Sequence, residues 1–427
     1  MIHDLYKKFV SSTGISTDTR NIKEGNLFFA LKGPNFDANN FAEKALEIGA
    51  SFSIIDDPNY QLNKCTILVE DVLETLQQLA NYHRRQFNIP VLAITGSNGK
   101  TTTKELINAV LSSKYETHAT SGNLNNHIGV PLTLLGISQS TEIAIIEMGA
   151  NSLGEISLLC KIAEPDLGII TNIGKAHTEG FGGFEGVIRG KSELYQWLHE
   201  RNGIVFINSK DEILKNMSKR FKEPLFYPNS EDYYHCDLVE VNPWLVLKDE
   251  SDETINTQLI GAYNFINVAT ALCIGKYFKV NPVDSRKAIS EYKPQNNRSQ
   301  VIKSGSNTII LDAYNANPDS VKAALNNLLK MEGKRKIVIL GDMFELGEIS
   351  ESEHRQIGKF TKSADFDEVY FCGRNMAVAA KENQKAVHFK MTKDLDNFLI
   401  NHNFKDSLIL IKGSRGMQLE SIIDTIR

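Results

Sequence analysis

VLAITGSNGKTTTKELINAVL, residues 91–111, is the stretch that decides the fold. Its first five residues predict a strand, residues 96–99 form a glycine-rich turn, and residues 100–111 have the spacing of an amphipathic helix. This order is typical of a phosphate-binding loop, because the turn's backbone N–H groups and the helix N-terminus surround phosphate oxygens. Lys100 then reaches the β- and γ-phosphates, and a Thr hydroxyl can ligate Mg²⁺. The predicted phosphate-binding residues are Gly96, Ser97, Asn98, Gly99, Lys100, Thr101 and Thr102.

The loop departs from the strict pattern G-x-x-x-x-G-K-[ST], because Ile94 stands five residues before Gly99. A shorter pattern, G-x-x-G-K-T, is present instead. The alternative is a glycine-rich βα turn that binds nothing. Strand, turn, Lys-Thr-Thr and helix occur here together, which favours phosphate binding.

Two further strand ends carry groups suited to a metal ion. Glu147 follows the apolar run IAII, and His177 lies in the loop after the run LGIIT. Ligands of open α/β sheets bind beyond the carboxyl ends of strands, so both side chains can meet Thr101 at one Mg²⁺. Either residue alone would more often be a solvated or capping group. Their placement around the predicted loop favours the metal site.

Short β-rich runs alternate with helix-like stretches along the chain, which predicts βαβ units and parallel sheets. We therefore expect an α/β protein with three domains: a small N-terminal α/β domain at 1–90, a central P-loop domain with a parallel sheet at 91–297, and a C-terminal Rossmann-like domain at 298–427. The second boundary falls in 281–300, where Pro, Asn and charged residues interrupt the apolar pattern. The predicted strands are 26–31, 51–55, 65–69, 91–95, 143–148, 167–171, 203–207, 308–312, 336–340, 368–372 and 407–411.

The stretch 209–257 is the least legible part of the chain. It has a charged, helix-like portion and an alternating run, WLVLK, that suggests a β excursion. No fixed-period repeat or low-complexity tract is present, which excludes solenoids and linker arrays.

Composition excludes several classes of protein. With 47 Lys and Arg against 52 Asp and Glu, the net charge is −5, so no basic field exists to hold nucleic acid or an anionic membrane. The five Cys are scattered without a CxxC pair and are expected to be reduced and buried rather than in disulfides or a zinc site. We find neither a signal peptide nor a membrane span and expect a cytosolic protein.

Polar residues also follow the strands of the C-terminal series. Asp312, Asp342 and Arg374 each come just after a predicted strand, and residues 412–415 follow the last one. Such loops on one sheet edge predict a second ligand face, which must oppose the phosphate-binding loop if both serve one reaction. The alternatives are an Asx turn capping a helix at Asn315, Asn317 and Pro318, and solvated side chains at Lys412 and Arg415.

ITGSNGKTTT, the Glu of EMGA and the His of NIGKAH resemble, in that order, the central domain of the Mur ligases, the ATP-dependent amide-forming enzymes of peptidoglycan synthesis. Folylpolyglutamate synthase and cyanophycin synthetase share that core. GNLNNHIGVPLTLL (122–135), LDAYNANPDSVKAAL (311–325), LGDMFELGE (340–348) and KGSRGMQLE (412–420) resemble the branch that joins D-Ala-D-Ala to UDP-MurNAc-tripeptide, as does DTRNIKEGNLFFALKGPNFDANNF (18–41). The resemblance runs from about residue 18 to 420.

The resemblance implies a peptidoglycan-precursor ligase that consumes ATP, forms an acyl phosphate and passes it to the dipeptide amine. It implies ATP and two Mg²⁺ ions as cofactors, UDP-MurNAc-tripeptide and D-Ala-D-Ala as partners, and a monomer. Whether the third residue of the tripeptide is meso-diaminopimelate or lysine stays open. So do two alternatives: the sister ligase that adds the third amino acid, and a non-catalytic nucleotide-binding protein of the same fold.

The resemblance also assigns roles to individual residues. Lys191, in RGKSEL, aligns with a lysine that is carbamylated in several Mur ligases; the alternative is a surface lysine paired with Glu193 or Glu185. In GAYNFIN, Asn264 and Asn267 match adenine-contacting positions, although Tyr263 replaces the usual His. The implied catalytic residues are Lys100, Lys191, His177, Glu147 and Arg298; the implied metal ligands are Thr101, Glu147, His177 and Lys191.

The remaining roles concern the substrates. Arg298 is implied to contact phosphate, and Asp312 to approach the ribose. The dipeptide pocket would include Asn315, Asn317 and loop 342–346. The uridine diphosphate site would comprise Thr19, Arg20, Lys32 and Gly33, with Asn123 and Asn126 near the muramoyl phosphate. Because two ligand faces lie on different domains, we expect the C-terminal domain to close over the loop when ATP and substrate bind.

Overall fold

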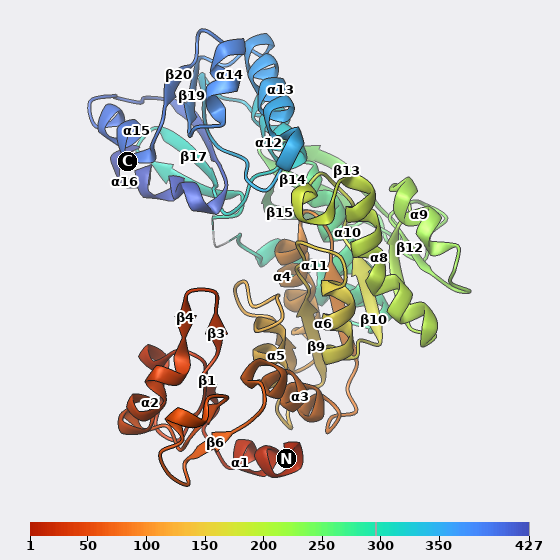
Figure 1. Ribbon diagram of the computed structural model, residues 1–427. Coiled ribbons are helices and arrows are strands. Elements are labelled where there is room, and N and C mark those ends of the chain that lie inside the picture. The colour runs from red at the N-terminus through yellow and green to blue at the C-terminus, as the bar shows by residue number, and fades with distance from the viewer. Residues whose placement is uncertain (295–296, 427) are drawn as a thin grey trace.

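A computed structural model describes residues 1–294 and 297–426. Three units, each built on a mainly parallel sheet, follow one another along the chain (Figure 1). The fold is α/β, as the sequence predicts. Every predicted strand is present, with ends shifted by at most two residues. Residues 295 and 296, in the predicted junction 281–300, lie outside the described residues.

The N-terminal unit is a small parallel sheet with helices on both faces. Alternating side chains divide its core: Leu27 and Phe29 pack toward α1 and α3, while Phe28 and Ala30 pack toward α2. Because α3 also contacts α5 and α6 of the central unit, it joins the two units. The sheet order is β1-β2-β5-β6, and the elements are α1 (Ile2–Val10), β1 (Ile15–Ser16), β2 (Leu27–Phe29), α2 (Ala42–Ile48), β5 (Phe52–Ile55), β6 (Thr66–Leu68) and α3 (Val72–Arg84), with a hairpin of β3 (Lys32–Gly33) and β4 (Phe36–Asp37).

The central unit is a parallel sheet in the order β12-β11-β10-β7-β9-β8. Its strands are apolar on both faces, as expected for a parallel sheet covered on both sides. Residues such as Val91 and Ala93 face α3, α5, α6 and α8, and residues such as Leu92 and Ile94 face α4, α10 and α11. The elements are β7 (Val91–Thr95), α4 (Lys100–Leu111), β8 (Thr117–Ala119), α5 (Gly129–Leu134), β9 (Ile143–Glu147), α6 (Glu155–Ala163), β10 (Leu167–Ile170), α7 (Thr178–Phe181), α8 (Phe184–Glu200), β11 (Ile204–Asn208), α9 (Glu212–Ser218), β12 (Leu225–Tyr227), α10 (Tyr263–Tyr277) and α11 (Pro282–Glu291).

The illegible stretch 209–257 folds as α9, the edge strand β12 and most of a separate antiparallel sheet. That sheet is formed by β13 (Cys236–Val241), β14 (Trp244–Asp249) and β15 (Thr254–Ile260). Its buried face, which includes Leu245, Leu247 and Ile255, packs into the same core as α4 and α10. The WLVLK run is therefore a half-buried strand, as its alternation indicates.

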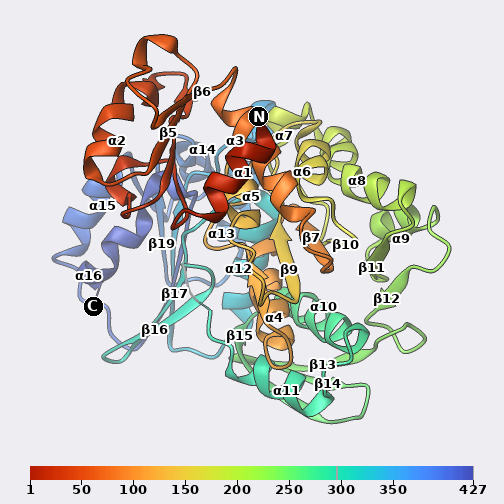
Figure 2. The same ribbon diagram turned by 90° about the horizontal axis from the view of Figure 1, so that it is seen from below.

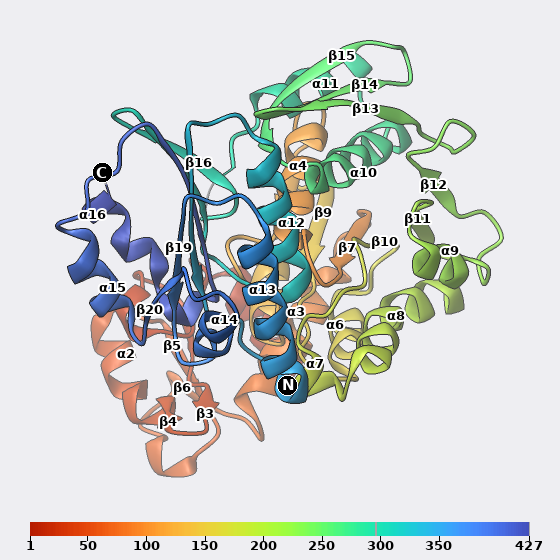
Figure 3. The same cartoon turned by 90° about the horizontal axis from the view of Figure 1, so that it is seen from above.

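The C-terminal unit is a sheet in the order β16-β17-β21-β18-β19-β20, parallel except for β16. Seen from above, α12, α13 and α14 lie on its side toward the central unit, and α15 and α16 on the other (Figure 3). The elements are β16 (Gln300–Ser304), β17 (Asn307–Asp312), α12 (Pro318–Lys330), β18 (Arg335–Gly341), α13 (Ser350–Ser363), β19 (Glu368–Cys372), α14 (Met376–Glu382), β20 (Val387–Phe389), α15 (Thr392–Leu399), β21 (Ser407–Lys412) and α16 (Ile423–Ile426).

Seen from below, the N-terminal and C-terminal units lie on the same side of the central unit, with α3 and α5 beside the N-terminal sheet (Figure 2). In the described residues, no helix combines the length and apolarity needed to cross a bilayer. The five cysteines, all described, form no disulfide; four are buried, as predicted, and Cys65 is only partly so.

Candidate active site

The candidate site lies beside β7, where the order in which the chain adds strands to the central sheet reverses. Strand β7 runs between β9 and β10, so the loops that follow these three strands meet at one sheet edge, the usual ligand position in open α/β sheets. A cavity of about 690 Å³ opens there and is walled on its far side by the C-terminal unit. Predicted residues in its lining are Ser97, Asn98, Gly99, Lys100, Thr101, Thr102, Asn126, Glu147, His177, Asn264, Asn267, Arg298, Asp312, Asn315 and Asn317.

Two glycines allow the loop its shape. Gly96 has φ +140°, and a Cβ there would lie 2.0 Å from Oγ1 of Thr171. Gly99 is left-handed at φ +78°, begins α4 as its N-cap, and would bring a Cβ within 2.8 Å of Asn267 Oδ1. Any other residue at either position would clash or be strained. The backbone can therefore approach a ligand closely at both turns.

Lys100 folds back over this loop. Its Nζ donates to the carbonyls of Gly96, at 2.8 Å, and Ser97, at 3.3 Å. Burial lowers the pKa of Lys100 to about 8; the charge of Glu147 opposes this shift, and the charge of Arg298 adds to it. A phosphate near Nζ would favour the charged form of Lys100.

Glu147 and Thr101 form the predicted metal pair. Thr101 Oγ1 donates to Glu147 Oε1 over 3.2 Å, and Asn125 Nδ2 donates to the same oxygen over 2.7 Å. The other oxygen, Oε2, is buried and has no hydrogen-bond partner in the described residues. A buried carboxylate oxygen without a partner is unfavourable, and a divalent cation with oxygen ligands fits it.

Lys191 is buried, with 1% of its surface exposed. The alternative of a surface lysine paired with Glu193 or Glu185 is therefore wrong, and Glu193 instead accepts bonds from the backbone N–H groups of Gly154 and Ser157. Lys191 Nζ donates to the carbonyl of Ala150 over 3.1 Å. Burial lowers the pKa of Lys191 to about 7, and the positive charge of Lys100 contributes.

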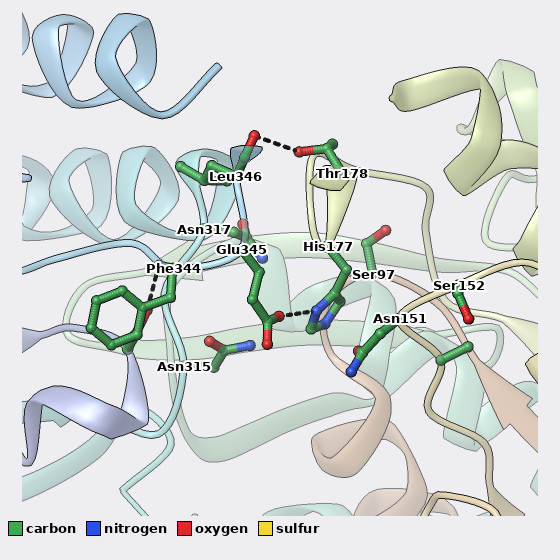
Figure 4. Close-up of polar contacts among 12 residues, drawn as sticks. Ser97, Asn151, Ser152, His177, Thr178, Asn315, Asn317, Phe344, Glu345 and Leu346 are labelled. Atoms are coloured by element: carbon green, nitrogen blue, oxygen red, sulfur yellow. Dashed lines mark hydrogen bonds and ion pairs between the residues drawn. The ribbon is translucent and has the colours of Figure 1, made fainter. Parts of the chain in front are cut away.

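His177 reaches the site from the loop after β10, with a left-handed φ of +56°. Its Nδ1 bonds to a carboxylate oxygen of Glu345 from the C-terminal unit (Figure 4). This hydrogen bond lowers the pKa of Glu345. Three or more His, Cys, Asp or Glu side chains do not gather around any one point in the described residues, so a metal here must also use hydroxyl, modified-lysine or phosphate oxygens.

The first turn of α10 supports the loop from below. Asn264 and Asn267 are buried; Asn267 Nδ2 donates to Asn264 Oδ1 at 2.8 Å, and Asn267 Oδ1 accepts from Thr103 at 3.1 Å. Tyr263, in place of the usual His, lines the cavity and hydrogen-bonds Ser299.

Arg298 lies beside the cavity with its guanidinium 3.7 Å from the ring centre of Tyr314. Its buried Nε has no hydrogen-bond partner in the described part of the chain. A guanidinium that lines a cavity and keeps an unsatisfied N–H suits an anionic ligand such as phosphate.

The C-terminal face of the cavity is built on neighbouring strands. Asp312 of β17 and Lys412 of β21 are register partners, which is why their side chains pair over 2.6 Å. Lys412 Nζ also donates to the carbonyl of Asn315, and the solvated alternative for Lys412 is wrong because it is 2% exposed.

Asn317 caps a helix and also lines the cavity. Its Oδ1 caps α12 by accepting from Ser320 N at 2.9 Å, within a capping box. Its Nδ2 donates to Asn98 Oδ1 over 2.6 Å and so reaches the phosphate-binding loop of the central unit. The capping turn and the ligand face are one structure.

Several predicted residues do not line the cavity. Asp342 is buried and accepts hydrogen bonds from the N–H groups of Asn375 and Met376 at the start of α14, and Arg374 and Arg415 are exposed outside the lining. The predicted face of four polar loops is therefore reduced to Asp312, Lys412 and the loop 315–317. Gly96 and Lys191 lie behind the lining, and Asn123 is exposed at its edge.

The residues predicted to hold uridine diphosphate lie in the N-terminal unit, outside this cavity. Thr19 and Arg20 form a short 3₁₀ turn, with Arg20 exposed and paired with Asp18. Lys32 pairs with Asp56 over 2.7 Å, and Gly33 is exposed in the β3–β4 hairpin. These residues present polar groups on a separate surface.

Sequence reasoning did not select several lining or supporting residues, among them Asn125, Asn172 and Tyr314, and it covered Glu345 only as part of loop 342–346. Asn172 Oδ1 accepts from Asn98 N at 3.0 Å and Asn172 Nδ2 donates to Asn98 O at 2.9 Å, so it fixes the loop. Asn125 and Tyr314 lie in segments 122–135 and 311–325, next to the predicted residues Asn126 and Asn315. No signal in the sequence alone places Glu345 against His177, because the contact spans 168 residues.

Comparison with known proteins agrees with this geometry. Residues 94–275 match the family model for the Mur ligase middle domain, and residues 297–415 match that for the Mur ligase, glutamate ligase domain. The UDP-N-acetylmuramoyl-tripeptide–D-alanyl-D-alanine ligase of Bacillus subtilis is 38% identical over 422 residues, which cover 96% of this chain and 92% of that protein.

Two solved structures share the whole architecture. A crystal structure of MurF from Acinetobacter baumannii matches with a TM-score of 0.89 and 30% identity, covering 99% of this chain and 97% of that one. MurF ligase from Thermotoga maritima in complex with ADP matches with a TM-score of 0.85 and 28% identity, covering 97% of both chains. Given the loop, the carboxylate and the C-terminal face described above, this chain belongs to the Mur ligase family, in the branch of the UDP-N-acetylmuramoyl-tripeptide–D-alanyl-D-alanine ligases.

Proposed function

We propose that this protein joins D-Ala-D-Ala to UDP-MurNAc-tripeptide in the cytosol and consumes one ATP. The observation that carries the proposal is the single cavity into which the phosphate-binding loop, Glu147 and the Asn315–Asn317 turn all project. A ligase needs a phosphoryl donor site and a nucleophile site within reach of one carbonyl carbon. Relatives of the chain carry the name of this ligase, which supports the same reaction.

The reaction has two steps. A carboxylate oxygen of the tripeptide first attacks the γ-phosphorus, the bond to the β,γ-bridging oxygen breaks, and ADP leaves. The dipeptide amine then attacks the acyl carbon, and the resulting tetrahedral species loses phosphate and a proton to give the amide. Each step brings anionic groups together, so catalysis requires neutralising charge and in-line positioning.

The chain supplies this positive charge from two sides. Lys100 sits over the loop that would hold the β- and γ-phosphates, and Arg298, with its unsatisfied Nε, faces the same space from the junction of the units. The buried pair of Asn264 and Asn267 would hold the adenine, and Asp312 the ribose. Ribose binding would require Asp312 to share the hydrogen bonds it now makes with Lys412 and Ser299.

Two Mg²⁺ ions complete the proposal. The unpartnered oxygen of Glu147 beside Thr101 fits one ion, and His177 with a carbamylated Lys191 would hold the second. Bound Mg²⁺ would neutralise charge on the γ-phosphate and the acyl oxygen. Lys191 suits carbamylation, since only a neutral amine adds CO₂ and its pKa of about 7 leaves a large neutral fraction at physiological pH.

The proposal divides the chain by task. Residues 1–90 would bind the uridine diphosphate through Thr19, Arg20, Lys32 and Gly33, with Asn123 and Asn126 guiding the muramoyl phosphate. Residues 91–297 would activate the carboxylate. Residues 298–427 would deliver the dipeptide through Asn315, Asn317 and loop 342–346, acting as one monomer.

The test is phosphate release by the purified protein with UDP-MurNAc-tripeptide, ATP and Mg²⁺, supplied with one amino donor at a time. Release only with D-Ala-D-Ala supports the proposal. A second assay replaces the tripeptide with UDP-MurNAc-dipeptide, and release only there, with a single amino acid, would assign the sister activity. Lys100→Ala should abolish release, whereas Lys161→Ala, which removes an exposed lysine from α6, should not change it.

A further inference from the structure

His177 is held from the opposite unit by a short segment that follows β18, residues 345–347. Besides the bond between Nδ1 and Glu345, Thr178 Oγ1 donates to the carbonyl of Leu346 over 3.2 Å. Gly347 packs so closely on Glu179 that a Cβ there would lie 3.1 Å from the Glu179 Cβ. Figure 4 shows the Glu345 side chain directed toward His177 and the Leu346 carbonyl toward Thr178, while Phe344 points away from them.

This segment is fixed within its own unit before it meets His177. Met343 N donates to Nε2 of the buried His354 over 3.1 Å, and Phe344 N donates to Ser414 Oγ over 3.0 Å. Asp342 is tied to the start of α14. The C-terminal unit therefore fixes the residues that lead into Glu345, and the Glu345 carbonyl itself accepts from Glu179 N of the central unit over 3.5 Å.

Both partners have unusual backbone conformations. His177 has φ +56° and Glu345 has φ +61°, a region that non-glycine residues rarely occupy. Such conformations persist when surrounding contacts hold them, and they concentrate at functional sites. Two of them facing each other across a unit boundary indicate a built contact rather than a chance meeting of surface groups.

The ring of His177 presents different nitrogens to the two sides. His177 lines the cavity and Glu345 does not, so the carboxylate stands behind the ring. A carboxylate at Nδ1 keeps the proton on that nitrogen and leaves the lone pair of the ring on Nε2. In the described residues Nε2 has no hydrogen-bond partner.

Resting on the metal role given to His177 above, we propose that Glu345 is a positioning residue that orients His177 for the second metal ion. Metal-binding histidines usually donate their other N–H to a carboxylate, which fixes the tautomer and ring orientation. Here that carboxylate comes from the unit that carries the dipeptide. The second metal site is therefore complete only when the C-terminal unit is closed, which couples delivery of the amine to activation of the acyl group.

The test uses Mn²⁺ as the probe, with the full chain, a non-hydrolysable ATP analogue and UDP-MurNAc-tripeptide. Mn²⁺ binding is titrated by electron paramagnetic resonance, and pulsed measurements report nitrogen coupling from a ligating imidazole. The variants are Glu345→Ala and Glu345→Gln. Glu348→Gln is the matched control, because Glu348 is exposed three residues away. Glu345 is itself largely exposed, so its removal leaves no cavity in the core.

We expect Glu345→Ala to weaken the nitrogen-coupled Mn²⁺ site by about 10- to 100-fold, the usual effect of losing such a carboxylate. Glu345→Gln, whose amide oxygen still accepts a hydrogen bond, should lie between it and the wild type. In Glu345→Ala the Mn²⁺ affinity of the site at Thr101 and Glu147 and the KM for ATP should be unchanged, while kcat falls together with the affinity of the nitrogen-coupled site. The control Glu348→Gln should behave as the wild type in all of these measurements.

Wild-type Mn²⁺ affinity and nitrogen coupling in Glu345→Ala would overturn the inference. So would nitrogen coupling that survives His177→Ala, since the ligand would then be another residue. The Mn²⁺ titration contains no dipeptide, so failure of phosphate release with D-Ala-D-Ala would reject the proposed function and leave the Mn²⁺ result for Glu345 standing.

Discussion

Asn317 connects the C-terminal unit to the phosphate-binding loop, and substitutions can separate its two tasks. Asn317→Ser keeps a side-chain oxygen that can cap α12, because Ser and Asn are equally good N-caps. The Ser side chain is too short to reach Asn98, so the bond of 2.6 Å across the units is lost. Asn317→Ala removes both the cap and the bond.

The two losses have different sizes and different consequences. Loss of an N-cap destabilises a helix by about 0.5–2 kcal/mol, which lowers the melting temperature of the unit by a few degrees. A hydrogen bond contributes a net stabilisation of about 0.5–1.5 kcal/mol, which corresponds to about a 2- to 12-fold change in an equilibrium constant. Asn317→Ser should therefore shift the balance of open and closed forms without changing thermal stability.

The assay is fluorescence energy transfer between one label on the central unit and one on the C-terminal unit, titrated with a non-hydrolysable ATP analogue and UDP-MurNAc-tripeptide. We expect the equilibrium constant for closure of Asn317→Ser to fall about 2- to 12-fold while its melting temperature stays at the wild-type value. In Asn317→Ala both the closure constant and the melting temperature should fall. Closure of Asn317→Ser at wild-type ligand concentrations would refute the reasoning. A melting temperature as low as that of Asn317→Ala would show that Ser does not replace the cap.

Three further outcomes follow from the site. Glu147→Gln should raise the Mg²⁺ concentration needed for half-maximal activity at least 10-fold without lowering the melting temperature in Mg²⁺-free buffer, because it removes the charge of a buried carboxylate whose Oε2 has no hydrogen-bond partner in the described residues; an unchanged Mg²⁺ requirement would contradict this. The neutral fraction of Lys191 rises as the pH passes its pKa of about 7, so CO₂ uptake, read as a mass increment, should rise from pH 6 to pH 8 and be absent in Lys191→Ala; uptake independent of pH would contradict the assignment. Lys175→Ala removes the ion pair with Glu353, which joins the two units over 2.7 Å. Because a partly exposed pair contributes up to about 1 kcal/mol, the equilibrium constant for closure should fall at most about 5-fold, and less at high salt. An unchanged closure constant at low salt would show that the pair does not contribute.

The parts of the fold that local sequence determines were predictable. Strands buried on both faces are continuous apolar runs, such as VLAIT and SLILI, and both occur where expected. The phosphate-binding loop was predictable because its two glycines are required by backbone conformation and close packing, which depend on neighbouring residues in a βα turn. Each of these signals needs fewer than about 20 residues.

Contacts between units were not predictable, because they depend on how separate cores are placed. The pairs Asn98–Asn317 and His177–Glu345 join residues more than 160 positions apart, and exposed polar side chains do not indicate their partners. The sequence left open whether Lys191 belongs to the site or to the surface, because its burial depends on tertiary contacts such as that with Phe181 of α7, whose ring centre lies 5.0 Å from Nζ. Of the short strands of 236–260, only the run WLVLK was recognised, from its alternation, whereas β13 is mostly exposed and so carries little apolar pattern.

The central claim is that one cavity first phosphorylates the tripeptide carboxylate and then exchanges that phosphate for the dipeptide amine. The most direct measurement uses UDP-MurNAc-tripeptide labelled with ¹⁸O in its terminal carboxylate and follows the label by mass spectrometry of the released phosphate. The account predicts one ¹⁸O atom in the phosphate for each amide formed, because the attacking carboxylate oxygen leaves with phosphorus. Unlabelled phosphate, with amide still formed, would contradict it.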